Sequence, residues 1–297
     1  MNFGKVEHPE KIDFTLPKDS PETLMFLKAH QNHKELEAYV GCAKWNRTDL
    51  KGFYPRGTKD ELSYYSKRFN SIELNATFYN MPKLALIETW KNKTPAGFKF
   101  FPKINQSISH IKRLKDIDGL VDEFCNAISG FENKLGMAFL QLDERFKPKD
   151  FDRLKAMLDN FPKSIPLGVE VRNEEWFMNK AINEAYTTLL EKHKMANIIV
   201  DTAGRRDLLH MRLTSPVAFI RYVGANDPTD TDRLDHWITR IKKWRKEGLQ
   251  KLYFFVHQNE ELESPRLAAH FIKNLNKTLG LSLPSPGEAG TQNSIFD

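Results

Sequence analysis

Short runs rich in Val, Ile, Phe and Tyr alternate along the chain with segments whose apolar residues recur at helical spacing. The eight runs that we predict as strands cover residues 38–43, 71–77, 98–103, 137–142, 167–172, 197–201, 217–223 and 252–257. The predicted helices cover residues 58–69, 84–91, 119–131, 150–161, 180–194, 231–246 and 265–279, with a shorter one at 205–212. Residues Thr58 to Glu61 (TKDE) match a capping box, which predicts a helix that begins there.

Strands that alternate with helices indicate a parallel sheet, and eight of them can close a TIM-type (β/α)8 barrel. An open, doubly wound sheet is the alternative for the same pattern. Residues 1–37 precede the repeat as an irregular arm and an added helix, and we predict that residues 38–283 form a single barrel domain. Residues 284–297 (PSPGEAGTQNSIFD) have the composition of a disordered tail.

Successive side chains of a strand point to opposite faces. In a barrel, one face packs against the helices and the other points into the barrel interior. In the second strand, Ile72 and Leu74 lie on the helix-facing side. The polar interior positions are Glu73, Asn75 and Thr77 in the second strand, Lys103 in the third, Gln141 in the fourth, Glu170 and Arg172 in the fifth, Arg221 in the seventh and His257 in the eighth. Barrel enzymes carry their chemistry at the C-terminal strand ends, so these positions predict one shared pocket.

Two glutamates and three cations dominate the predicted pocket. Glu73 or Glu170 is a candidate general acid or base if burial raises its pKa, and two carboxylates across a pocket also suit glycoside hydrolysis. Lys103, Arg172 and Arg221 are candidates for binding phosphate or carboxylate. Because a buried charge is costly unless it is paired, a structural ion-pair network is the alternative.

Further candidates lie in loops and at strand ends. His110, in the long loop 104–117 after the third strand, is a candidate acid/base or lid residue, and a loop-anchoring histidine is the alternative. The remaining candidates for substrate binding are Asn75, Tyr79, Gln141, Trp176, His257 and Asn259. Aromatic residues near strand ends are more often core residues than ligand contacts. Residues 224–226 (GAN) follow the seventh strand, where barrels often bind phosphate.

We expect neither a metal nor a cofactor. Glu, Asp and His near the strand ends are suitable ligand types, but the sequence has no closely spaced set such as HExxH, and three inward cations would repel a metal ion. The sequence also has no GxGxxG or GxxxxGK[ST] motif, so the common nucleotide-binding loops are not predicted.

Composition narrows the class of protein. The chain has 297 residues, of which 40% are hydrophobic and 28% charged, as in an ordinary globular protein. No run approaches the ~18 apolar residues of a membrane span, and Met1 to Leu16 lack the apolar run of a signal peptide. With only Cys42 and Cys125 present, these features predict a cytoplasmic protein whose two cysteines are buried and reduced.

Charge favours an anionic partner. The formal net charge is +6 and the sequence pI is about 9.1. The densest basic run, Arg240 to Arg245 (RIKKWR), has Ile238, Ile241 and Trp244 at helical spacing, so its basic residues lie on the opposite face. A solvated helix face is the first interpretation, and a patch for nucleic-acid phosphates is the alternative.

Several short motifs occur in a fixed order along the chain. They are GCAKW at 41–45, GFYP at 52–55, FNSIELNATFYNMP at 69–82, FKF at 98–100 with Lys103, QL at 141–142, EVR at 170–172 with Trp176, and Arg221 with Gly224. This ordered set resembles the family called domain of unknown function 72, or YecE-like, over roughly residues 40–279. The resemblance implies a TIM barrel and no named activity. The chain departs from the family pattern at Val223, where histidine is common, and at Asp143, where proline is common.

The pocket favours an enzyme that acts on a small anionic substrate, such as a phosphorylated or carbohydrate compound. One alternative is a nucleic-acid-binding or nucleic-acid-processing protein, suggested by the net charge and the basic run. Another is a non-catalytic protein that binds a ligand in the same pocket. No membrane partner is expected.

Overall fold

Parallel strands form the centre of the molecule in the computed structural model, which describes residues 3–32 and 34–287. The strands are β1 (Glu37–Cys42), β2 (Ser71–Leu74), β3 (Lys99–Pro102), β4 (Ala138–Leu142), β5 (Leu167–Val171), β6 (Ala196–Asn197), β7 (Ile199–Asp201), β8 (Val217–Gly224) and β9 (Lys251–Gln258). They form three sheets with the orders β1-β9-β8-β7, β2-β3 and β4-β5-β6. Every strand pair within these sheets is parallel, as the alternating pattern predicts.

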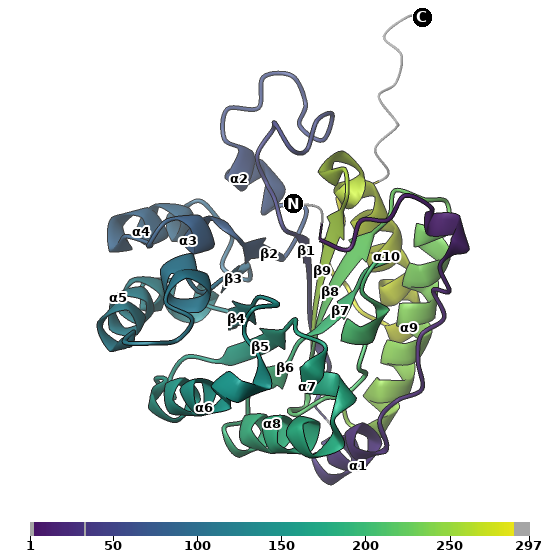
Figure 1. Cartoon of the computed structure of the whole chain (residues 1–297). Coiled ribbons are helices and arrows are strands. Elements are labelled where there is room, and N and C mark those ends of the chain that lie inside the picture. The colour runs from purple at the N-terminus through teal and green to yellow at the C-terminus, as the bar shows by residue number, and fades with distance from the viewer. Residues whose placement is uncertain (1–2, 33, 288–297) are drawn as a thin grey trace, which may run out of the picture.

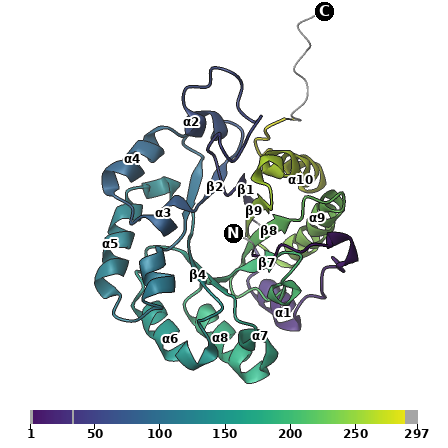
Figure 2. The ribbon, with the colours of Figure 1, turned by 45° about the horizontal axis from the view of Figure 1, so that its top comes forward.

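Helices lie outside the strands, which surround the centre of the molecule (Figures 1 and 2). They are α1 (Pro21–Ala29), α2 (Glu61–Tyr65), α3 (Ala76–Tyr79), α4 (Leu84–Asn92), α5 (Asp118–Ser129), α6 (Phe151–Asn160), α7 (Glu175–Met178), α8 (Lys180–Lys192), α9 (Asp230–Glu247) and α10 (Ser264–Leu279). Short 3-10 helices cover Pro9–Lys11, Glu132–Lys134, Pro148–Asp150, Arg206–Leu208 and Glu261–Glu263, and a π-helix covers Ser107–Ile111. The result is a mixed α/β fold with parallel sheets.

The expected continuous eight-stranded ladder is present only in part, because side chains replace backbone pairing between β1 and β2. The Asn70 amide donates to the Ala38 carbonyl at 2.8 Å and accepts from the Val40 amide at 2.9 Å. The Tyr65 hydroxyl bridges the backbones of the same two strands at 2.7 and 3.0 Å. The strands pass so closely that a side chain on Gly41 would collide with the β2 backbone. This seam therefore requires glycine on one side and polar connectors on the other.

The predicted sixth strand, residues 197–201, is divided at Ile198 into β6 and β7. The Ile198 amide donates to the Val169 carbonyl at 2.9 Å, but its own carbonyl accepts from His210 Nε2 at 3.1 Å. Asn197 is held by the Tyr186 hydroxyl at 3.0 Å. Side-chain bonds thus replace ladder bonds at this point, where the chain passes from β6 in the third sheet to β7 in the first sheet. Isolated parallel bridges also connect β3 with β4.

Apolar side chains form two layers, one inside the strands and one between strands and helices. The inner layer contains Phe101, Met137, Phe139, Ala196, Ile198, Val200, Leu208, Val217, Phe219, Tyr253 and Phe255. The outer layer contains Ile72, Leu74, Leu167, Val169 and Val171, among many others. The faces predicted from strand alternation are therefore confirmed. Full burial of one such side chain contributes about 1.5–3 kcal/mol, which explains why the apolar face fixes each strand's register.

Several predicted boundaries are wrong for local reasons. The second strand ends at Leu74, since Asn75 turns the chain into α3. Helix α2 begins three residues after Thr58, because Asp60 is the N-cap and accepts a hydrogen bond from the Ser63 amide at 2.9 Å. The helix predicted at 205–212 is reduced to one 3-10 turn, Arg206–Leu208.

The N-terminal arm runs past β7, β8 and α9 to α1, as Figure 1 shows. Its Asp19 accepts from Arg240 at 2.7 Å, Lys243 at 2.5 Å and the Trp244 indole at 2.9 Å. The apolar residues of the basic run, including Trp244, are buried as predicted. Most of the predicted tail, residues 288–297, lies outside the described residues. No helix in the described ranges is long and apolar enough to cross a membrane.

Candidate functional site

A cavity of about 560 Å³ lies at the C-terminal ends of the strands. Eight of the predicted site residues line it: Asn75, Tyr79, Lys103, Gln141, Arg172, Arg221, His257 and Asn259. Glu73 and Glu170 are fully buried beneath this wall, and neither lines the cavity. Strand alternation thus brings the predicted polar residues together, but it does not show which of them reach the ligand space.

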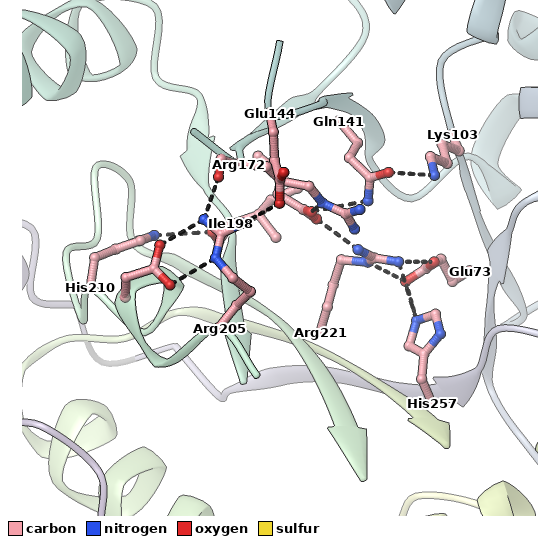
Figure 3. Close-up of polar contacts among 12 residues, drawn as sticks. Glu73, Lys103, Gln141, Glu144, Arg172, Ile198, Arg205, His210, Arg221 and His257 are labelled. Carbon is pink, nitrogen blue, oxygen red and sulfur yellow. Dashed lines mark hydrogen bonds and ion pairs between the residues drawn. The ribbon is translucent and has the colours of Figure 1, made fainter. Parts of the chain in front are cut away.

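Arg221 on β8 is the centre of the buried polar cluster (Figure 3). Its Nε and Nη2 donate to both oxygens of Glu73 on β2, each at 2.8 Å. Its Nη1 donates to Glu170 Oε2 on β5 at 2.7 Å. The three residues belong to three different sheets. This charge-assisted cluster therefore ties the sheets together across the interior.

Glu170 also organises the opposite side of the cluster. Its Oε1 accepts from Arg172 Nε at 2.6 Å and from Gln141 Nε2 at 3.0 Å. The Gln141 amide oxygen in turn accepts from Lys103 Nζ at 2.8 Å. Figure 3 shows Gln141 between Arg172 and Lys103. Gln141 therefore orients the lysine while joining it to Glu170.

Both carboxylate oxygens of Glu73 also have hydrogen-bond partners. Besides Arg221, it accepts from Asn75 Nδ2 at 2.9 Å and contacts His257 Nε2 at 2.9 Å. The other ring nitrogen of His257 lies 3.7 Å from Glu261 Oε1. Asn75 and His257 thus satisfy Glu73 and at the same time form part of the cavity wall.

The arginines keep both buried carboxyl groups ionised. Burial raises the pKa of Glu170, but Arg221 and Arg172 outweigh it and lower that pKa to about 2. Burial also raises the pKa of Glu73, but Arg221 and His257 lower it more strongly, so this pKa lies well below its usual range. The proposed acid/base role required a raised pKa, so that condition is not met for either glutamate. Their contacts match the structural alternative.

Two other groups in the wall have shifted pKa values. Burial lowers the pKa of Lys103 to about 7, and Arg221 and Arg172 act in the same direction. The pKa of His257 is raised above its usual value. Burial by itself would lower this pKa, but Glu73 and Glu261 outweigh the effect of burial. Groups of this kind are typical of sites that transfer protons.

Arg172 lines the cavity and has donors that no described residue binds. Its Nε binds Glu170, whereas no partner for Nη1 or Nη2 occurs among the described residues. The Phe3 ring of the N-terminal arm stacks on the guanidinium at 3.5 Å, and Arg205 fixes the Arg172 carbonyl at 2.5 Å. The edge of a guanidinium held in one orientation is suited to phosphate or carboxylate.

The structure corrects the prediction for Trp176. Its side chain is completely buried in the outer layer, where it packs against Phe146 and Tyr186. The indole N–H donates to the Phe146 carbonyl at 3.0 Å. Trp176 is a core residue, because α7 turns it away from the strand-end cavity and toward the helix layer.

His110 lies in a neighbouring cavity of about 590 Å³, which shares Tyr79 with the first. Its Nδ1 is 2.9 Å from Ser109 Oγ, and its ring packs edge-on against Phe78. Burial lowers the pKa of His110 to about 4. The contacts match a loop-anchoring histidine more closely than an acid/base in the first cavity.

The loop after β8 does not offer its amides to a phosphate. The Asp230 carboxylate accepts from the Ala225 amide at 3.0 Å and the Asp227 amide at 3.2 Å, and Gln258 accepts from the Asn226 amide at 3.0 Å. An internal carboxylate thus occupies the position that the predicted phosphate would take.

Several wall residues were missed by the sequence analysis. Phe3, Lys44 and Glu261 line the cavity together with Val223, the position where the family pattern commonly has histidine. Lys44 follows the first strand and could have been found as another strand-end cation. Phe3 reaches the cavity only through the path of the arm, which no local pattern encodes. The described residues contain no group of three or more His, Cys, Asp or Glu side chains arranged to hold a metal ion.

Parallel strands, outer helices and a polar cavity at the strand ends define an α/β protein with a strand-end pocket. The chain belongs to the family described as "Protein of unknown function DUF72", whose family model matches residues 39–289. It is 27% identical over 263 residues to UPF0759 protein YecE of Escherichia coli, covering 81% of this chain and 93% of that one. It is 28% identical to UPF0759 protein YunF of Bacillus subtilis over 149 residues, 47% of this chain and 52% of that one.

Solved structures of the family share the fold. A DUF72 protein from Thermotoga maritima matches with a TM-score of 0.64 and 24% identity, covering 81% of this chain and 99% of that one. One from Enterococcus faecalis matches with a TM-score of 0.66 and 17% identity, covering 84% and 100%. At these identities the likeness concerns the fold alone.

Proposed function

We propose that the chain is an enzyme whose strand-end cavity binds a small anionic substrate, such as a phosphorylated or carbohydrate compound. Arg172 supports this proposal most directly, because it lines the cavity and its two terminal nitrogens have no hydrogen-bond partner among the described residues, while Nε is fixed by Glu170. A guanidinium oriented in advance loses little conformational freedom when it binds an anion.

The charge of the buried cluster supports the same ligand class. Lys103, Arg172 and Arg221 are three cations, whereas Glu73 and Glu170 are two carboxylates. The low pKa of Lys103 reflects burial and the repulsion of two arginines. A bound anion would relieve that repulsion and supply the missing negative charge.

Catalysis, as opposed to binding alone, is supported by Lys103 and His257. Both line the cavity; the pKa of Lys103 is lowered to about 7, and that of His257 is raised by Glu73 and Glu261 against the effect of burial. A proton donor or acceptor works best with a pKa near the working pH. We assign proton transfer to these two residues and a supporting role to the two glutamates.

We also propose that the three sheets form one TIM-type barrel and that the protein is intracellular. The strand order follows the chain around the ring, and side-chain seams and isolated bridges fill the interruptions in the ladder. The Arg221 cluster links the three sheets from inside. Chemistry at the C-terminal ends is the arrangement that such barrels use.

The nucleic-acid alternative has less support. Arg240 and Lys243 of the basic run bind the buried carboxylate of Asp19, and Arg245 donates to the Leu249 carbonyl at 3.0 Å. Arg240 and Lys243 therefore hold the N-terminal arm on α9. Salt-dependent binding of DNA or RNA in an anisotropy titration would favour the alternative.

The test is anion binding, measured by calorimetry and by the shift in melting temperature at low ionic strength. The panel contains phosphate, sulfate, 2-oxo acids and sugar phosphates. We expect Arg172→Met to weaken binding at least tenfold, whereas the exposed Arg153→Met control leaves it unchanged. Equal binding by the Arg172 variant, or no binding by the wild type, would refute the proposal. A ligand that binds without conversion, followed by NMR, favours a non-catalytic binding protein.

A further inference from the structure

Lys103 differs from the other buried cations of the cluster because it has no ion pair. Arg221 and Arg172 occupy the oxygens of Glu73 and Glu170, and Lys103 Nζ donates instead to the neutral amide of Gln141 at 2.8 Å. Within residues 3–32 and 34–287, no carboxylate lies within ion-pair distance of its amine. Such a buried ammonium lacks the partner that usually keeps it charged.

The surroundings of the amine are those of a nucleophile. Its side chain is almost fully buried, yet it lines the cavity. The Phe78 ring lies 4.0 Å from Nζ, and Gln141 holds the nitrogen in place. Burial and neighbouring cations both favour the neutral amine, which carries the lone pair that attacks a carbonyl.

We propose that Lys103 forms a Schiff base with the carbonyl group of an anionic substrate, namely a 2-oxo acid or the phosphate ester of a ketone or aldehyde. This assignment rests on the proposed function, because Arg172 holds the anionic group in the same cavity. It adds a covalent step and a substrate class to that function.

The step balances without an oxidant or reductant. The Nζ lone pair forms the bond to the carbonyl carbon, and the carbonyl π electrons move to oxygen. A proton passes from nitrogen to that oxygen and gives a carbinolamine. Loss of the hydroxyl group with the remaining amine proton releases one water and leaves the imine, which a solvent proton converts to the iminium ion. The iminium ion then withdraws electrons from the adjacent carbon.

The test is reductive trapping. The full-length protein is incubated at pH 7 with sodium cyanoborohydride and with pyruvate, dihydroxyacetone phosphate or neutral hydroxyacetone, and adducts are located by peptide mass spectrometry. At pH 7 an amine with a pKa of about 7 is half neutral, about a thousandfold more than an ordinary lysine. We expect adducts of the two anions on Lys103 at least tenfold above those on surface lysines. The Lys103→Arg variant keeps the charge and should show no adduct at that position.

A second variant tests the role of the surroundings. Gln141→Glu places a carboxylate where the amide oxygen now accepts from Nζ. We expect trapping at pH 7 to fall at least tenfold and to recover near pH 9, because the new charge favours the ammonium form. Unchanged trapping would contradict our account of the amine. The charged and titratable groups that face Lys103 in this experiment are Glu73, His110, Glu170, Arg172 and Arg221.

The outcomes separate this inference from the proposed function. If anions bind and Arg172→Met abolishes the binding, but no adduct forms on Lys103, the Schiff base is refuted and the anion site stands. If hydroxyacetone labels Lys103 as strongly as the two anions do, and Arg172→Met changes nothing, the anionic substrate class is refuted. Because wild-type protein gives the decisive measurement, a variant that fails to fold does not remove the test.

Discussion

Removal of the Arg221 charge should destabilise the fold in a pH-dependent manner. Arg221→Met keeps an unbranched apolar chain of similar length but leaves the carboxylates of Glu73 and Glu170 without their shared partner. Both carboxyl groups are buried. Breaking a buried pair in this way costs about 3–5 kcal/mol. The change in the pKa of Glu170 from 4.5 to about 2 corresponds to about 3 kcal/mol, of the same order.

The sign of the pH dependence follows from the same contacts. In the wild type, the lowered pKa values of Glu73 and Glu170 stabilise the fold above the unfolded-state pKa, and that contribution is lost as the pH falls through the folded values. In the variant, Arg221 no longer opposes the effect of burial on Glu73 and Glu170, so burial favours the neutral form of both carboxyl groups. The stability of the variant should therefore decline as the pH rises from 5 to 7. Over the same range, Glu73 and Glu170 change the stability of the wild type only slightly.

The assay is thermal and urea unfolding, followed by circular dichroism at pH 5 and pH 7. We expect the melting temperature to fall by on the order of 10 °C at pH 7 and by less at pH 5. The double variant Arg221→Met with Glu73→Gln should recover at least ~1 kcal/mol, because one uncompensated charge is gone. Arg153→Met, which removes an exposed arginine from its pair with Asp150, serves as the control. A loss below ~1 kcal/mol, or one equal at both pH values, would show that the cluster does not support the fold.

Three further changes test other parts of the argument. Glu73 and Glu261 act against burial and raise the pKa of His257. The stabilisation that results is complete below the unfolded-state pKa and is lost as the pH rises through the folded-state pKa. His257→Gln should therefore flatten the decline in urea midpoint above pH 6.5, and an unchanged slope would contradict this. Tyr65→Phe removes the hydroxyl that bridges β1 and β2 and should cost about 1–3 kcal/mol in urea unfolding; no loss would mean that the seam does not need it. Trp176→Phe should lower the melting temperature without changing anion affinity, whereas altered affinity would return Trp176 to the site.

The sequence predicted the strands and their faces because a period of two is a local property. Glu73, Gln141, Glu170, Arg221 and His257 lie on the expected side of their strands, whereas Asn75 and Thr77 lie beyond the end of β2, at the start of α3 and within it. The break at Ile198 was not predictable in this way, since it depends on His210, which lies outside that strand. The path that brings Phe3 over Arg172 likewise depends on tertiary contacts.

The candidate site was predictable as a set of residues, but not as a division of roles. Glu73 and Glu170 have the residue type of acids and bases, and only their contacts show that every oxygen is occupied. Trp176 follows a strand end closely, yet a short helix turns it into the outer layer. Proximity to a strand end therefore identifies candidates, whereas side-chain direction and partner count decide between them.

The three buried cations illustrate how one cluster can support both fold and function. Arg221 binds two carboxylates from two other sheets, so its donors are largely committed to structure. Arg172 commits only Nε, and Lys103 commits its amine to a neutral amide. If the cluster were only structural, the simplest arrangement would pair each cation with a carboxylate and leave no excess charge facing a cavity. The donors without a carboxylate partner are Lys103 Nζ and the terminal nitrogens of Arg172, and both residues line the cavity, where a bound anion would complete the network.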